Sequence, residues 1–171
     1  MSEITKCLNE WNATIEALGQ GKQTILIRKT VTSLNEFLLY PTVSYAIKND
    51  VLDSFQDKEF AKNNLLPIGE NGTYQVKYYA TIEEIIEKNS RRIGAFNKFH
   101  NWTSNHVKKY LGRNNAKIWI LRVYELDEPQ MLKRSRAIRY ANVNKPVKLE
   151  GKPVIPDNEF NKLKEEILNT K

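Results

Sequence analysis

A short segment near the middle of the chain combines an imidazole, an indole and a hydroxyl group. His100, Trp102 and Thr103 lie within four consecutive positions. An indole can stack on a nucleobase, and an imidazole can donate a hydrogen bond or move a proton. Trp102 also follows Phe99 by three residues, a spacing equally typical of the core face of a helix. The segment is therefore either a wall of a base-binding pocket or a plain part of the core.

A second group of candidates lies where two short strands are expected. Lys22 lies at the start of the first strand, and Arg28 and Lys29 lie at its end. Arginine can hold a phosphate through its planar fork, and lysine through a point charge. Tyr40 and Thr42 end the second strand, where a tyrosine ring stacked on a base would contribute about 1–3 kcal/mol. Solvated strand ends, with the tyrosine half buried in the core, are the structural alternative.

The strongest strand signal, at residues 116–126, carries an arginine and a tyrosine on one face. Side chains two residues apart point the same way, so Arg122 and Tyr124 face either a pocket or the solvent at a sheet edge. Clustered basic residues before and after this strand are natural contacts for phosphates, and a solvated basic loop explains them equally well. These basic candidates are Lys108, Lys109, Lys133, Arg134, Arg136 and Arg139.

The distribution of charge favours a polyanionic partner. The chain of 171 residues has a net charge of +7. Residues 88–139 contain thirteen Lys and Arg against three acids, a balance of +10, so the rest of the chain sums to −3. A field of one sign attracts polyanions and speeds their encounter. We predict that the partner is a nucleic acid, DNA or RNA. An acidic protein partner and a solvated basic surface are the alternatives.

No catalytic motif stands out in the sequence. His100 and His106 are six residues apart and the chain has one cysteine, so a zinc site is not expected. The seven glycines form no phosphate-binding loop. Asp127, Glu150 and Lys152 are the nearest match to the carboxylate set of a nuclease, although the glycine between the last two favours a turn. We favour a non-catalytic protein without cofactor or metal, and retain a metal-dependent nuclease as an alternative.

The pattern of elements predicts an α+β fold, with a small mixed sheet or β-barrel flanked by helices. We expect one domain over residues 1–171, with a core over about 8–150 and a C-terminal helix over about 157–169 that Asp157 caps. The sequence contains no apolar run that could span a membrane and no signal peptide, and the lone Cys7 fits a reducing compartment, so we expect a cytoplasmic protein. Helical segments are expected at 3–18, 91–111 and 157–169, irregular or helical structure at 43–66, a turn at 69–72, and strands at 24–28, 36–40, 74–81, 116–126 and 146–149.

Several segments together resemble an uncharacterised family, domain of unknown function 1802. The matching segments are Trp11 with Ala17-Leu18, then residues 21–29, 37–42, 100–103 and 121–126, with Pro129. The activity of that family is not established. Some of its members look as though they are fused to restriction-endonuclease domains, which implies a restriction or defence setting and a partner of that type. Thr30-Val31 replaces the two glycines of the family pattern, Tyr45 replaces its histidine, and its Gly-Cys-x-Ser-Trp segment is absent here.

The order of strands resembles, at the level of fold, the PUA-like superfamily, which includes EVE, YTH and ASCH domains. That resemblance implies a small barrel that reads RNA or holds a flipped, often modified base. Together with the basic residues, it leads to the hypothesis of a nucleic-acid-binding domain in a restriction or defence context.

Overall fold

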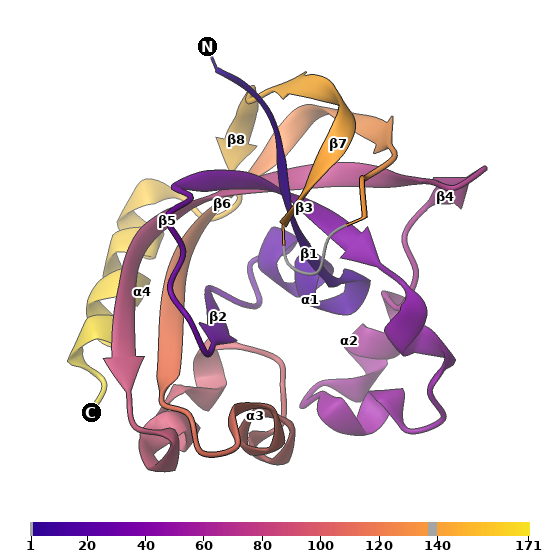
Figure 1. Ribbon diagram of the computed structural model, residues 1–171. Helices are drawn as coiled ribbons and strands as arrows, with labels where there is room; N and C mark the ends of the chain where they lie inside the picture. The colour runs from indigo at the N-terminus through magenta and orange to yellow at the C-terminus, as the bar shows by residue number, and fades with distance from the viewer. Residues whose placement is uncertain (1, 137–139) are drawn as a thin grey trace.

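The computed structural model describes residues 2–136 and 140–171, and it confirms the predicted mixed α+β fold (Figure 1). Its sheet has the strand order β2-β6-β5-β3-β1-β7, with β4 paired to β5 and β8 paired to β6. All pairs are antiparallel except β1 with β3. The strands are β1 (Glu3–Trp11), β2 (Ile25–Arg28), β3 (Glu36–Thr42), β4 (Gly69–Glu70), β5 (Thr73–Lys88), β6 (Ala116–Leu132), β7 (Tyr140–Lys148) and β8 (Gly151–Pro153). The helices are α1 (Asn12–Gly19), α2 (Lys58–Asn63), α3 (Ser104–Leu111) and α4 (Asp157–Asn169), with 3₁₀ turns η1 (Ser44–Ile47), η2 (Val51–Ser54) and η3 (Ser90–Phe99).

The residues that follow β6 pair with β7, the last strand in the order of the sheet. Arg134 forms a β-bridge with Val143, and the amide of Ser135 donates to the carbonyl oxygen of Asn142 at 2.8 Å. The edge strand β7 is thereby hydrogen-bonded to residues beyond the end of β6, while the sheet keeps the open strand order β2-β6-β5-β3-β1-β7. The long strands β5 and β6 bend together and run down to η3 and α3 (Figure 1), with register shifts along their ladder.

The buried apolar residues form two cores. The smaller core includes Cys7, Leu38 and Leu132. The larger core includes Leu8 and Trp119, with Leu18 of α1 and Phe160 of α4. Burial raises the pKa of the Cys7 thiol to about 11, so the thiol stays protonated at neutral pH.

The first two elements of the chain are the strand β1 and the helix α1. The prediction of one helix over 3–18 is therefore wrong for the residues of β1. Cys7 and Leu8 point to opposite faces of β1 and enter different cores. A strand buried on both faces loses the alternating pattern, so the three- and four-residue spacing of Ile4, Leu8 and Trp11 imitated a helix.

Two other predicted boundaries and one predicted helix cap are wrong for local reasons. β3 continues through Pro41 to Thr42, because β5 pairs only with the start of β3 and requires no amide hydrogen at the proline. β6 likewise continues past Pro129, which lies where the ladder with β5 shifts register. The last helix begins as predicted, but Pro156 is its N-cap and Asp157 instead forms an ion pair with Arg122.

Candidate functional site

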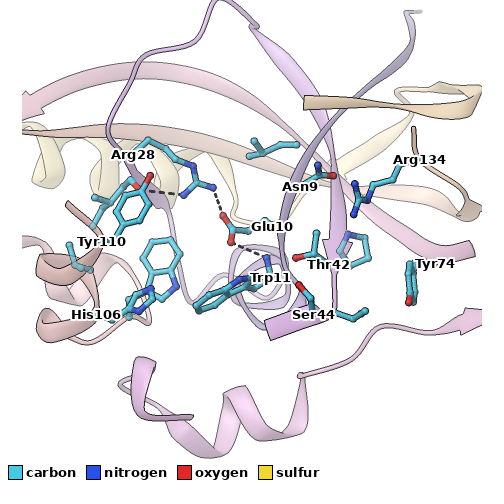
Figure 2. Close-up of a pocket in the computed structure, with 16 residues that line it drawn as sticks. Asn9, Glu10, Trp11, Arg28, Thr42, Ser44, Tyr74, His106, Tyr110 and Arg134 are labelled. Carbon is cyan, nitrogen blue, oxygen red and sulfur yellow. Dashed lines mark hydrogen bonds and ion pairs between the residues drawn. The ribbon is translucent and has the colours of Figure 1, made fainter. Parts of the chain in front are cut away.

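A cavity of about 700 Å³ opens between β1 and β2, which are not paired with each other in the sheet. The helix α3 and the turn η1 form its other walls (Figure 2). A volume of this size is typical of sites that bind small molecules or a single nucleotide. The lining residues are Leu8, Asn9, Glu10, Trp11, Ile27, Arg28, Pro41, Thr42, Val43, Ser44, Tyr74, Trp102, His106, Val107, Tyr110 and Arg134.

An ion pair joins the two strands across the cavity. The guanidinium of Arg28 on β2 contacts the carboxylate of Glu10 on β1, and both side chains are largely buried. The other carboxylate oxygen of Glu10 accepts a hydrogen bond from the amide of Trp11 at 2.9 Å. Burial alone would lower the pKa of Arg28, but the charge and hydrogen bond of Glu10 outweigh burial, and the pKa is raised. The cavity wall therefore presents a fixed cation whose charge Glu10 balances.

Aromatic rings form one end of the cavity. The indole of Trp11 stacks on Tyr45 with ring centroids 4.8 Å apart and an interplanar angle of 4°, which fixes its orientation. The imidazole of His106 lies 5.2 Å from Trp11 and 6.3 Å from Trp102, centroid to centroid. Tyr110 on α3 continues this wall toward the solvent, and its side chain is partly exposed. Flat apolar surfaces of this kind are suited to a planar ring.

Polar groups form the opposite end (Figure 2). Asn9, Thr42, Ser44, Tyr74 and Arg134 lie there. The exposed guanidinium of Arg134 lies 5.6 Å from the ring centroid of Tyr40, and it forms no ion pair with a carboxylate of residues 2–136 or 140–171. This end therefore offers hydroxyl groups, an amide and a cation to a polar or anionic part of a ligand.

Further cations surround the aromatic end. The Nζ atom of Lys29 lies 4.8 Å from the ring centroid of Tyr110. Burial lowers the pKa of His106, and the positive charges of Lys109 and Lys48 lower it further, against the opposing effect of Glu10. His106 is therefore neutral at pH 7, and the positive field at the rim comes from exposed lysines.

The structure brings some of the sequence candidates to this cavity and places others elsewhere. Arg28, Thr42, Trp102 and Arg134 line it, and Lys29 and Lys109 border it through Tyr110 and His106. Lys108 on α3 and Arg136 are exposed and line no wall of the cavity. Arg139 lies outside the described residues.

Four other candidates do not line the cavity and have structural contacts instead. Lys22 forms an ion pair with Asp57 at 3.2 Å. The buried hydroxyl of Tyr40 donates to the carbonyl oxygen of Leu132 at 2.8 Å. The remaining pair, Arg122 and Tyr124, packs against other groups: Arg122 contacts Asp157 at 2.6 Å, and Tyr124 stacks on Tyr79.

His100 and Thr103 shape the segment that carries Trp102. The Nδ1 atom of His100 accepts from the amide of Trp102 at 3.1 Å, and burial lowers the pKa of His100 to about 4. Thr103 caps α3, because its hydroxyl accepts from the amide of His106 at 3.2 Å. The two residues thus position Trp102 and His106 and do not line the cavity themselves.

Sequence reasoning missed the β1 side of the cavity. Asn9, Glu10 and Trp11 were assigned to a helix, so the side chains that face β2 were not considered together. Their signal was present in the sequence, since Trp11 belongs to the segments that resemble the family. Ser44, Tyr74, His106 and Tyr110 carry no local pattern that singles them out.

The carboxylates considered for a nuclease lie on another side of the molecule. The amide of Asp127 donates to the carbonyl oxygen of Glu150 at 2.9 Å, and both residues line an open hollow beside β6 and β7. Across the part of the chain that the structure describes, no three His, Cys, Asp or Glu side chains gather closely enough to hold a metal ion. Among the same residues, no helix has the length and apolar character needed to cross a membrane.

The fold and the cavity define a basic α+β domain with an aromatic and cationic pocket. The chain belongs to the family described as Domain of unknown function (DUF1802), whose model matches residues 7–166. The predicted family membership is therefore confirmed. No curated protein matches the chain.

Solved structures similar to this chain include the ASCH protein from Zymomonas mobilis. The identity is 14% and the TM-score 0.46, with 94% of this chain and 93% of that chain covered. Two mutants of the same Zymomonas protein match with TM-scores of 0.45 and 0.47, at 15% and 12% identity, and cover 97% and 94% of this chain and 83% and 94% of those chains.

Proposed function

We propose that the protein binds nucleic acid and holds one nucleotide in the cavity between β1 and β2. The base would lie at the aromatic end against Trp11 and Tyr110, and the phosphate would lie at the polar end near Arg134. The observation that carries this proposal is the arrangement of one cavity with stacking surfaces at one end and a cation without a carboxylate partner at the other. Stacking on an aromatic side chain contributes about 1–3 kcal/mol per base and tolerates any sequence.

The rim supports a strand that continues beyond the cavity. Lys29 and Lys109 lie beside the aromatic end, and Arg134 lies at the polar end. Cations on both sides of an opening can contact the phosphates that precede and follow an inserted nucleotide. An acidic protein would use the same charges but would leave the aromatic cavity without a ligand, so nucleic acid fits the site better. The restriction or defence setting stays a prediction from the family resemblance.

Fluorescence anisotropy with labelled single-stranded RNA and DNA tests this proposal. Replacing Arg134→Gln should weaken binding by about tenfold and reduce the slope of log affinity against log salt by about one, because one phosphate contact is lost. Tyr110→Ala should weaken binding at every salt concentration without changing that slope, because stacking is uncharged.

The matched control is Arg92→Gln, which removes an exposed arginine of η3 that lines no wall of the cavity. Equal losses for Arg92→Gln and Arg134→Gln would show that only net charge matters and would contradict the pocket. Affinity that does not change between low and physiological salt would contradict nucleic-acid binding as a whole.

A further inference from the structure

A second hollow of about 330 Å³ adjoins the cavity. Val43 and Tyr74 line both of them, so the two hollows are neighbours. The remaining wall of the second hollow consists of residues 66–67 and of the hairpin at 69–73. The hollow lies at the polar end of the cavity, on the side where the phosphate of the bound nucleotide is proposed to lie.

The hairpin between β4 and β5 is a rigid support for Tyr74. Asn71 and Gly72 have φ angles of 53° and 80°, the left-handed conformations of a two-residue Asn-Gly hairpin turn. A Cβ atom at Gly69 would lie 2.6 Å from the ring of Tyr74, so the absent side chain lets the ring lie directly on the hairpin. Tyr40 contacts the same ring edge-on, with centroids 6.3 Å apart. Tyr74 is therefore a fixed aromatic wall that the two hollows share.

Two consecutive basic residues, Lys133 and Arg134, lie next to the two hollows. Arg134 lines the first cavity, and the Cε atom of Lys133 lies 3.5 Å from the Cβ position of Gly72, beside the second hollow. Lys133 is exposed and forms no ion pair with a carboxylate in the described parts of the chain. Successive phosphates of one strand would each find a cation in this arrangement.

We infer that the second hollow binds the neighbouring nucleotide of the same strand, so that the site holds two consecutive nucleotides, with Tyr74 in the wall of the second position. This inference rests on the proposed function, because the first nucleotide occupies the cavity. In this arrangement the base would pack against the ring of Tyr74 and the exposed side chain of Leu66, and the second phosphate would lie near the ammonium group of Lys133. Stacking on one further ring requires no particular base, so the second position tolerates any base.

Two small ligands with equal numbers of phosphates distinguish one subsite from two. A nucleoside 3′,5′-bisphosphate fills the cavity alone, and a 5′-phosphorylated dinucleotide fills the cavity and the second hollow. We expect the dinucleotide to bind about tenfold more tightly in isothermal titration, because it stacks one more base. Equal affinities, with Arg134→Gln weakening both ligands, would overturn the second subsite and leave the proposed function intact.

A matched pair of variants tests whether the higher affinity for the dinucleotide arises in the second hollow. Leu66→Asp puts a carboxylate on the wall of that hollow, and Ile68→Asp puts the same charge two residues away on a side chain that does not line it. Both side chains are well exposed, at 64% and 66%, so neither change disturbs the core. Leu66→Asp should abolish the tenfold preference for the dinucleotide, and Ile68→Asp should keep it. The same preference in both variants would overturn this subsite, and failure of the unaltered protein to bind either ligand would overturn it together with the proposed function.

Discussion

Two buried arginines of this protein have similar surroundings and different roles. Arg28 on β2 pairs with Glu10 and lies 5.9 Å from the ring centroid of Trp119. Arg122 on β6 pairs with Asp157 and lies 4.6 Å from the ring centroid of Phe160. Arg28 lines the large cavity, whereas the space beside Arg122 is only about 10 Å³. Both were predicted to face a ligand, and the structure gives only one of them room to do so.

The difference arises from the element that supplies the carboxylate. Asp157 is the first residue of α4, and this helix covers Arg122, whose Nη2 atom also donates to the carbonyl oxygen of Ile155 at 2.9 Å. Glu10 belongs to β1, which stays apart from β2, so the Arg28 pair crosses an open space (Figure 2). An arginine that fastens a helix to the sheet contributes to stability. An arginine that bridges two separated strands also shapes a site.

The largest expected effect comes from neutralising Glu10. Glu10→Gln leaves the buried Arg28 without its counterion, and removing one partner of a buried ion pair costs about 3–5 kcal/mol in the free energy of unfolding. Urea denaturation followed by circular dichroism measures this loss. Adding Arg28→Met to Glu10→Gln removes the isolated charge and should restore part of the stability. A loss below about 1 kcal/mol for Glu10→Gln would show that the pair behaves like an exposed one.

A smaller effect on stability, with none on binding, is expected at Arg122. Arg122→Met removes the two hydrogen bonds that the guanidinium donates to Ile155 and Asp157. Because the donor is charged, their loss should lower the free energy of unfolding by about 1.5–3 kcal/mol. The carboxylate of Asp157 is 81% exposed, so water can solvate it in the variant. Oligonucleotide affinity, measured where the variant is folded, should equal that of the unaltered protein. A loss similar to that of Arg134→Gln would assign Arg122 to the binding surface.

The sequence predicted what depends on local pattern and failed where distant segments meet. The strands at β2, β5 and β6 were predicted because β-branched and aromatic residues mark them locally, and a turn was predicted at 69–72, of which Asn71 and Gly72 form the turn itself. The cavity depends on β1 and β2 remaining apart, which no local signal encodes. Arg28 and Arg122 both follow apolar strand residues, and nothing in the local sequence shows that Glu10 and Asp157 are their partners. The site was therefore predicted in part, with Arg28, Thr42, Trp102 and Arg134, and without the β1 residues.

The smallest expected effect is a loss in the free energy of unfolding in mild acid. The group responsible lies on the side of the molecule that carries Arg28. Both histidines lie on that side, with His100 in the core 5.6 Å from Trp102 and His106 in the cavity wall. Burial lowers the pKa of His100 from 6.5 to about 4, so protonation favours the unfolded chain. Stability is complete above the unfolded pKa and falls as the pH drops toward the folded value. The loss from His100 between pH 7 and about pH 5.5 is about 1 kcal/mol.

Urea denaturation at the two pH values should show this loss. The variant His100→Asn should reduce it, because the side-chain oxygen of asparagine can still accept from the amide of Trp102 but does not titrate. If His100→Asn lost as much stability as the unaltered protein between the two pH values, the acid sensitivity would belong to other groups.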